Sequence, residues 1–182
     1  MKLVDKDAVY LREGLDILFI ALNPPRQSNA NGHYFSGRNS RFFKQLFKSG
    51  LITENLNKLV ADDLVFGGTK FNYKNKLFGV IDLKPRTEET NSNKVRVMRE
   101  EVILMIDRIR RYRPRRVCII HSEVRKQFGK MTGITLQDGF NGKVLEGCDT
   151  DFYYNHFPNG SNIPDEVKID IYRIIRDSLD RQ

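Results

Sequence analysis

The sequence of 182 residues predicts a single α/β domain, a three-layer α/β/α sandwich with a mainly parallel central sheet of about four strands. Two observations favour this fold class. Short apolar segments alternate with segments whose apolar residues recur at helical spacing, which is typical of a parallel sheet covered on both faces. No repeat, low-complexity tract or linker divides the chain, so one domain is expected over residues 1–182.

Each strand is predicted from a short apolar or aromatic run bounded by polar, Gly or Pro residues. The four predicted strands cover 16–22, 77–83, 116–121 and 152–157. Helices are predicted where apolar residues recur every three or four positions. The three predicted helices cover about 39–49, 94–113 and 164–180.

Three further segments have weaker local signals. The last helix is expected to have Pro164 in its first turn and to be capped by the Asn and Ser just before it. A turn at 139–142 is expected to lead into a short strand at 143–145. The polar segment 67–75, with two Gly and two aromatic residues, fits a surface loop better than the rim of a binding site.

The chain is basic: 31 Lys and Arg against 23 Asp and Glu give a net charge of +8. Such a field attracts polyanions, and nucleic acid is the commonest partner of this kind, although many proteins are basic for solubility alone. The arginine-rich run at 108–116 is expected to form a solvated face. It should lie at the end of the sheet opposite the carboxyl ends of the strands, and so away from the expected binding site. DNA is therefore the expected partner.

Composition also limits the class of protein. No apolar run has the length of a membrane span and no signal peptide is visible, so we expect a cytoplasmic, nucleoid-associated protein, and a monomer. Two cysteines exclude a four-thiolate cluster, and the three histidines, at 33, 121 and 156, are scattered without metal-ligand spacing. No metal and no cofactor are expected.

Two loops occupy the place where open parallel sheets bind ligands, beyond the carboxyl ends of strands. The first, 21–37, is long for a connection and stiffened by two prolines after Asn23, whose amide is suited to bind a polar edge or fix a water. Of its aromatics, Tyr34 is expected to cover the core, whereas Phe35 fits the core or a ligand equally well. The second loop, 157–164, precedes a helix whose N-terminus is suited to a phosphate.

Together these loops resemble the uracil-DNA glycosylase superfamily, specifically its mismatch-specific uracil/thymine-DNA glycosylase branch. In that branch Gly-Ile-Asn-Pro-Gly ends the first strand, where this chain has Ala-Leu-Asn-Pro-Pro at 21–25. A Gly-x-x-Phe element and an Asn-Arg-Phe-Trp helix start follow, here at 32–35 and 39–43. The second motif, Leu-Pro-Asn-Pro-Ser-Gly, corresponds to Phe-Pro-Asn-Gly-Ser-Asn at 157–162.

The resemblance implies a DNA glycosylase that flips uracil, or a related deaminated or mismatched base, out of the helix and hydrolyses its glycosidic bond. Asn23 would orient the water that attacks the sugar C1′. Phe35 would stack on the base, and Leu22 would line the pocket through its backbone. The residues implied to contact DNA near the reaction centre, or to enter the gap left by the base, are Asn159, Gly160, Ser161, Asn162 and Ile163.

The implied chemistry needs no pair of carboxylates, because a uracil-type base can leave as a stabilised anion. No lysine of the motifs suggests a Schiff base, so the enzyme is expected to be monofunctional. Pro25, beside the base pocket, departs from the second Gly of the motif; it removes a backbone N–H and restricts space. The alternative is therefore a non-catalytic nucleic-acid-binding relative with a closed pocket. A metabolic enzyme acting on a free nucleotide is a third hypothesis, but the chain has neither a dinucleotide fingerprint nor a P-loop.

Overall fold

The computed structural model describes residues 1–181 and has five strands in one sheet, in the order β2-β1-β3-β5-β4. Four strands are parallel to their neighbours, and β4 pairs antiparallel with β5 at one edge. Their bounds are β1 Ile17–Ala21, β2 Phe78–Asp82, β3 Arg116–Ile119, β4 Gly139–Lys143 and β5 Asp151–Tyr154. The mainly parallel sheet predicted from the sequence is confirmed.

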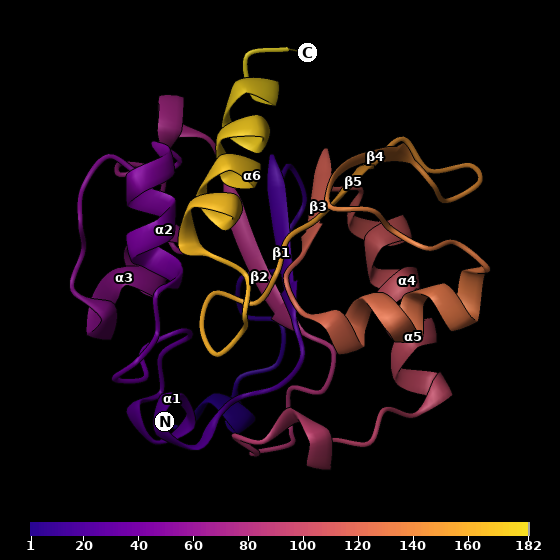
Figure 1. Ribbon diagram of the computed structural model, residues 1–182, viewed down its shortest axis with the longest axis horizontal. Coiled ribbons are helices and arrows are strands. Elements are labelled where there is room, and N and C mark those ends of the chain that lie inside the picture. Colours follow the sequence, from indigo (N-terminus) through magenta and orange to yellow (C-terminus); the bar gives the residue numbers. More distant parts are fainter. Residues whose placement is uncertain (182) are drawn as a thin grey trace.

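Helices cover both faces of the sheet (Figure 1). Their bounds are α1 Arg26–Asn31, α2 Phe42–Ser49, α3 Lys58–Val65, α4 Arg99–Tyr112, α5 Ser122–Thr132 and α6 Asp165–Ser178. Short 3-10 helices lie at Leu3–Asp5, Tyr73–Asn75 and Ser92–Lys94. The predicted three-layer α/β/α sandwich is thus confirmed.

Successive side chains of β1 point to opposite faces of the sheet, and therefore into two separate halves of the core. Ile17, Phe19 and Ala21 pack in the cluster under α2, α3 and α6, whereas Leu18 and Ile20 pack in the cluster under α4 and α5. All five side chains are buried, as expected for a central strand with helices on both faces. Among residues 1–181, no helix is both long and apolar enough to cross a membrane.

The element boundaries differ from the prediction in two places. The strand expected at 143–145 instead covers Gly139–Lys143, because Phe140 packs on Tyr153 of the neighbouring strand and a bulge follows it. The N-cap of α6 is Pro164, and no side chain caps the helix, because the hydroxyl of Ser161 accepts the backbone N–H of Ile163 instead. The Asn/Ser cap predicted from the sequence was therefore wrong.

The arginine-rich segment 108–116 lies at the amino end of β3, away from the carboxyl ends of the parallel strands. It is not simply a solvated face. Arg108 forms a bidentate ion pair with Asp7, and the buried Arg116 donates to the hydroxyl and the carbonyl of Ser178. Arg108 therefore ties the N-terminal segment to α4, and Arg116 ties α6 to the sheet.

Candidate functional site

A cavity of about 430 Å³ lies at the carboxyl edge of the parallel strands. Its volume falls within the range of roughly 300–1,000 Å³ that is usual for small-molecule sites. Both loops singled out in the sequence contribute to its wall. The predicted site residues that line it are Leu22, Asn23, Pro25, Phe35, Asn159, Gly160 and Ser161.

The amide of Asn23 is held in one orientation. Its Nδ2 donates to the carbonyls of Glu89, Thr87 and Pro24 at 2.8, 3.0 and 3.2 Å. Both amide hydrogens are therefore used by the backbone, and no hydrogen bond to Oδ1 is found among residues 1–181. The side chain offers one free acceptor oxygen at the cavity wall, which is the arrangement needed to bind a water molecule.

Leu22 and Pro25 flank this asparagine along the wall. The Leu22 carbonyl already accepts the N–H of Lys84 at 2.7 Å, and its side chain is buried in the core under α4 and α5. Pro25 precedes α1, and its carbonyl accepts the N–H of Asn29. The proline forms part of the wall without closing the cavity beside it.

Phe35 has a left-handed backbone with φ of 54°, which is rare for a residue with a bulky side chain. Its ring packs on Phe42 with 4.0 Å between centroids, and it also lines the cavity. Tyr34 is 3% exposed and packs edge-on against Tyr10, as the core role predicted for it requires. Both aromatics line the cavity, but Tyr34 is buried, whereas Phe35 is half-buried and more accessible to a ligand.

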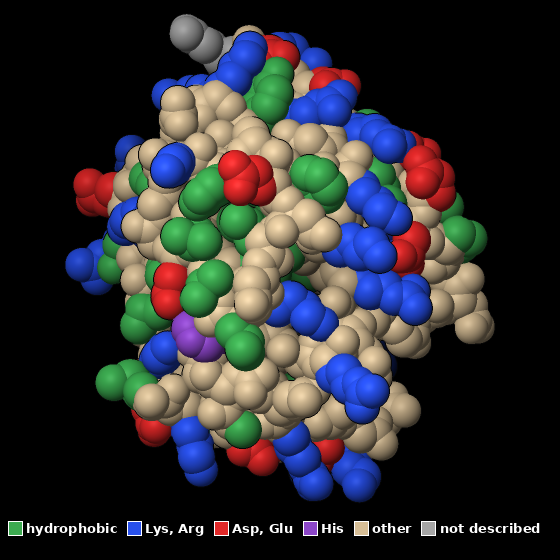
Figure 2. All heavy atoms as spheres, turned by 90° about the vertical axis from the view of Figure 1, so that its left-hand side faces the viewer, with side chains coloured by type: hydrophobic (Ala, Val, Ile, Leu, Met, Phe, Trp, Pro, Cys, Tyr) green, Lys and Arg blue, Asp and Glu red, His purple; other side chains and the backbone are tan. Residues whose placement is uncertain are grey.

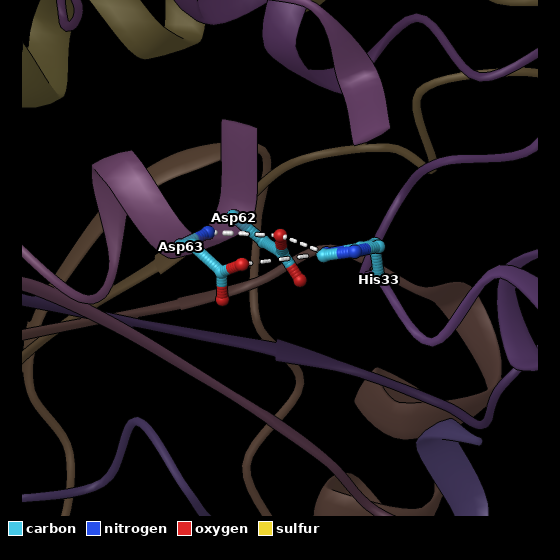
Figure 3. Close-up of side chains that lie close together, drawn as sticks. All are labelled: His33, Asp62 and Asp63. Carbon is cyan, nitrogen blue, oxygen red and sulfur yellow. Dashed lines mark hydrogen bonds and ion pairs between the residues drawn. The ribbon is translucent and has the colours of Figure 1, made fainter. Parts of the chain in front are cut away.

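The buried carboxylate of Asp62 lies beside His33, close to Phe35 in the sequence (Figure 3). Asp62 accepts the backbone N–H of Tyr34 at 2.9 Å and lies 2.8 Å from Nδ1 of His33, which is 3.7 Å from Asp63. Burial raises the pKa of Asp62. The donor atoms lie within 4.8 Å of one another, so this group could in principle hold a metal ion. Spacing along the sequence did not reveal it, because His33 and Asp62 are 29 positions apart.

Two buried side chains hold the second loop through hydrogen bonds to its backbone. The carbonyl of Pro158 accepts Nε2 of Gln45 at 2.9 Å and Nζ of Lys168 at 3.0 Å. These bonds place Asn159 at the cavity wall. Beyond it, Asn162 is exposed and Ile163 half-buried, and neither lines the cavity.

The cavity also contains titratable residues that the sequence reasoning did not select. Asp82 ends β2 and is 5% exposed, and burial together with the like charge of Asp7 raises its pKa to about 7. His121 follows β3; its Nδ1 accepts the N–H of Glu123 at 3.0 Å, so that in the neutral ring Nε2 carries the proton. Burial lowers the pKa of His121, which favours that neutral form. A polar residue at the end of an apolar strand was the available signal in both cases.

His156 comes directly before the second loop in the sequence but is not part of the cavity wall. Its Nε2 lies 2.8 Å from Asp138. The polar segment 67–75 does not reach the cavity either. Its Asn72 is buried and donates to the backbone carbonyls of Val65, Gly68 and Lys76. These hydrogen bonds hold the segment against the neighbouring backbone.

A basic groove of about 830 Å³ adjoins the cavity and shares Arg38, Asn39, Ser40, Asn159 and Gly160 with it. Arg41 and Lys44 continue its wall along the start of α2, and Lys58 does so from the start of α3. Figure 2 looks onto the α2–α3 side of the molecule, and Lys and Arg side chains gather in the right-hand half of that view. A positively charged groove that leads to a small polar cavity suits a phosphodiester chain with one base in the cavity.

Comparison with known families gives a match to the uracil DNA glycosylase superfamily over residues 9–158, which include the first loop with Asn23 and Phe35 and end just before Asn159 of the second loop. The chain belongs to the uracil-DNA glycosylase superfamily. Proteins of this superfamily are generally DNA glycosylases, which are hydrolases that act on DNA. No curated protein matches the chain. The superfamily match ends before α6, although Lys168 of this helix binds the second loop.

Proposed function

We propose that this member of the superfamily is a monofunctional DNA glycosylase that removes uracil, or a related deaminated or mismatched base, as proteins of the mismatch-specific branch do. The orientation of Asn23 is the observation that carries the proposal. Its amide hydrogens are donated to three backbone carbonyls. The Oδ1 atom is therefore left to accept a hydrogen bond from a water molecule at the wall of a base-sized cavity. Fixing a water in this way lowers the entropic cost of its attack.

In the proposed reaction, DNA binds along the basic groove and one nucleotide turns out of the duplex into the cavity. Phe35 stacks on the base, and the water held by Asn23 attacks C1′ of the sugar. The C–O bond forms as the C1′–N bond breaks, the electron pair leaves with the base, and the proton of the water passes to solvent. The products are an abasic site and the free base.

The leaving base gains negative charge, and an N–H donor at the cavity wall would stabilise it. The neutral His121, with its proton on Nε2, is suited to donate in this way. Among residues 1–181, no lysine lines the cavity, in keeping with hydrolysis rather than strand cleavage through a Schiff base. We further propose that the protein acts as a monomer on duplex DNA, in the cytoplasm at the nucleoid.

The test is excision from duplexes that carry uracil, hypoxanthine, xanthine or a G·T mismatch, followed by alkali to cleave abasic sites. We expect excision by the wild type and a loss of at least a hundredfold in Asn23→Ala, because the water is no longer positioned. The exposed Asn93, outside the cavity, gives the matched control Asn93→Ala, which should retain activity. Salt-dependent DNA binding without excision of any of these bases would instead support a non-catalytic binding protein.

A further inference from the structure

A second hollow, of about 840 Å³, lies at the amino edge of the sheet, where β3 and β5 begin. We call it the amino-edge cleft; its wall includes Arg110, Arg113, Arg115, Phe140 and Lys143. It shares no lining residue with the base-sized cavity or with the basic groove beside that cavity. In Figure 1 this edge lies toward the top, beside the end of α6, whereas the loop that contains α1 lies at the bottom.

Cations outnumber acids in the amino-edge cleft. Six Lys and Arg side chains line it, against only two acids, Asp149 and Asp151. Arg113 and Arg115 are exposed, and neither side chain makes an ion pair or a hydrogen bond among residues 1–181. Their charges are therefore not compensated by the protein, and a polyanion is the ligand that such a field attracts.

Two further cations of the cleft have only weak partners. Arg110 donates to the carbonyl of Glu146 at 2.6 Å, a neutral acceptor that does not cancel its charge. Lys143 lies 3.6 Å from Asp149, but both side chains are exposed, so this ion pair contributes little and is screened by salt. Either cation can thus bind a phosphate without the loss of a buried ion pair.

An exposed aromatic ring lies among these cations. Phe140, on the edge strand β4, is 56% exposed, and its ring packs on Tyr153 with 5.3 Å between centroids. Proteins that bind single strands combine a basic groove for the phosphates with an aromatic ring on which a base stacks. A duplex keeps its bases stacked on one another, and an acidic peptide would meet the negative face of the ring. The combination therefore favours a single strand.

We propose that the amino-edge cleft binds single-stranded nucleic acid, with Arg113 and Arg115 on its phosphates and one of its bases stacked on Phe140. The cleft lies at the opposite edge of the sheet from the base-sized cavity, so this inference does not depend on the proposed glycosylase function. It gives the protein a second contact with nucleic acid. A strand bound there leaves the cavity open to a nucleotide from another segment.

The experiment places a fluorescent reporter in the cleft. The chain has no tryptophan, so Phe140→Trp introduces a single indole, whose fluorescence is quenched when a base stacks on it. Titration with an oligothymidylate should quench this fluorescence. Leu104→Trp is the matched control, because Leu104 lies on α4, is 49% exposed and lines neither the cleft nor the cavity; its fluorescence should not change. Quenching by an oligouridylate of equal length would extend the site to RNA.

The cations are tested in the Phe140→Trp background. Arg113→Gln combined with Arg115→Gln should reduce the slope of log affinity against log salt by about 1.4, because each phosphate contact on a single strand contributes about 0.7. Lys126→Gln combined with Lys130→Gln removes the same charge from exposed positions on α5 and should leave the slope unchanged. Circular dichroism checks that each variant is folded, and anisotropy of a labelled oligothymidylate measures the same slopes with Phe140 intact.

Three results would overturn the inference: no quenching in Phe140→Trp, an unchanged salt slope in the double arginine variant, or stronger quenching by a duplex or by polyglutamate than by oligothymidylate. Excision of uracil from a short duplex by the double arginine variant should equal that of the wild type, because the cleft and the cavity share no residue. A wild type that excises no base, with quenching as expected, refutes the glycosylase proposal alone. Excision without quenching refutes the role of the cleft alone.

Discussion

At the scale of single residues, the left-handed backbone of Phe35 is the clearest sign of a functional constraint. Such a conformation costs on the order of 1–3 kcal/mol and persists only where its surroundings enforce it. Here Asp62 binds the N–H of Tyr34, and Phe42 packs on one face of the Phe35 ring. The strain therefore keeps an aromatic ring at the cavity wall.

Phe35→Ala should lower excision about 5- to 150-fold, because stacking of a base on an aromatic ring is worth about 1–3 kcal/mol. The measurement is kcat/KM on a uracil-containing duplex. Phe47→Ala is the control, because Phe47 lies on α2, is 39% exposed and does not line the cavity. Equal effects of the two substitutions would show that Phe35 contributes only hydrophobic area.

Asp82 should also make the stability of the fold depend on pH. Its pKa is about 7 in the folded protein against an ordinary value of 3.8, so the folded state holds a proton that the unfolded chain has released between these values. The free energy of unfolding should therefore fall as pH rises through this window, by at most about 1.4 kcal/mol per pH unit, and level off above it.

Asp82→Asn removes this effect. Thermal unfolding at pH 5 and pH 8 should show the variant gaining stability relative to the wild type at the higher pH, and Asp149→Asn should show no such gain. If the difference between Asp82→Asn and the wild type is the same at both pH values, Asp82 does not titrate in this range in the folded protein.

Residue types and their order were enough to predict that Asn23 and Asn159 border one site, but not that Asp82 and His121 join them. Asp82 and His121 reach the cavity because the strand order puts β2 and β3 on either side of β1, so that all three strands end at one edge. Strand order depends on contacts between distant segments, and periodicity along the chain does not contain that information.

At the scale of elements, the second loop depends on α2 and α6, which pack against each other. Gln45 and Lys168, each 1% exposed, donate to the same carbonyl of Pro158 from these two helices. Burial lowers the pKa of Lys168. A buried ammonium with so few partners contributes little to stability, so its effect is to position the loop.

Lys168→Met keeps the length of the side chain and removes the bond. We expect weaker excision or weaker DNA binding, because Asn159 is less well placed. The melting temperature should change little, because the substitution also removes a desolvated charge. Melting temperature and kcat/KM measure the two effects. Lys126→Met, at an exposed site on α5, is the control. A large fall in melting temperature with normal activity would assign Lys168 to the core instead.

The strands and the longest helices could be predicted because each contains a continuous apolar run or a long apolar stripe. The short helix α2 was predicted as well, but α1, α3 and α5 were not. In α5 only Val124 and Phe128 are buried, and α1 buries only Ser28 and Asn29, so neither helix has a stripe that sequence periodicity would detect. The edge strand β4 was misplaced because only one of its five residues is buried.

At the scale of the whole molecule, the net charge of +8 favours binding of DNA, and in the proposed complex the groove decides where the backbone lies. Arg41 is paired with Asp165, and Lys58 donates to the carbonyls of Gly37 and Arg38. Lys44 is exposed in the groove and lies outside the cavity. It is therefore the cation whose removal tests the path of the DNA without disturbing the base site.

Lys44→Gln should reduce the slope of log affinity against log salt by about 0.9, the value for one lost phosphate contact on duplex DNA. Excision of base at saturating enzyme should be unchanged. Lys130→Gln, an exposed change on α5, should leave the slope as in the wild type. An unchanged slope in Lys44→Gln would place the DNA backbone elsewhere on the surface.

The anchoring of the Asn23 amide by main-chain carbonyls has an evolutionary consequence. Since Thr87 and Glu89 hold it through their peptide groups, their side chains are free to vary without releasing it. Mutations at these positions can thus change which ligand fits the cavity, while the geometry proposed to position the water is retained. A scaffold of this kind can diversify its targets in single steps, with no intermediate that has lost its chemistry.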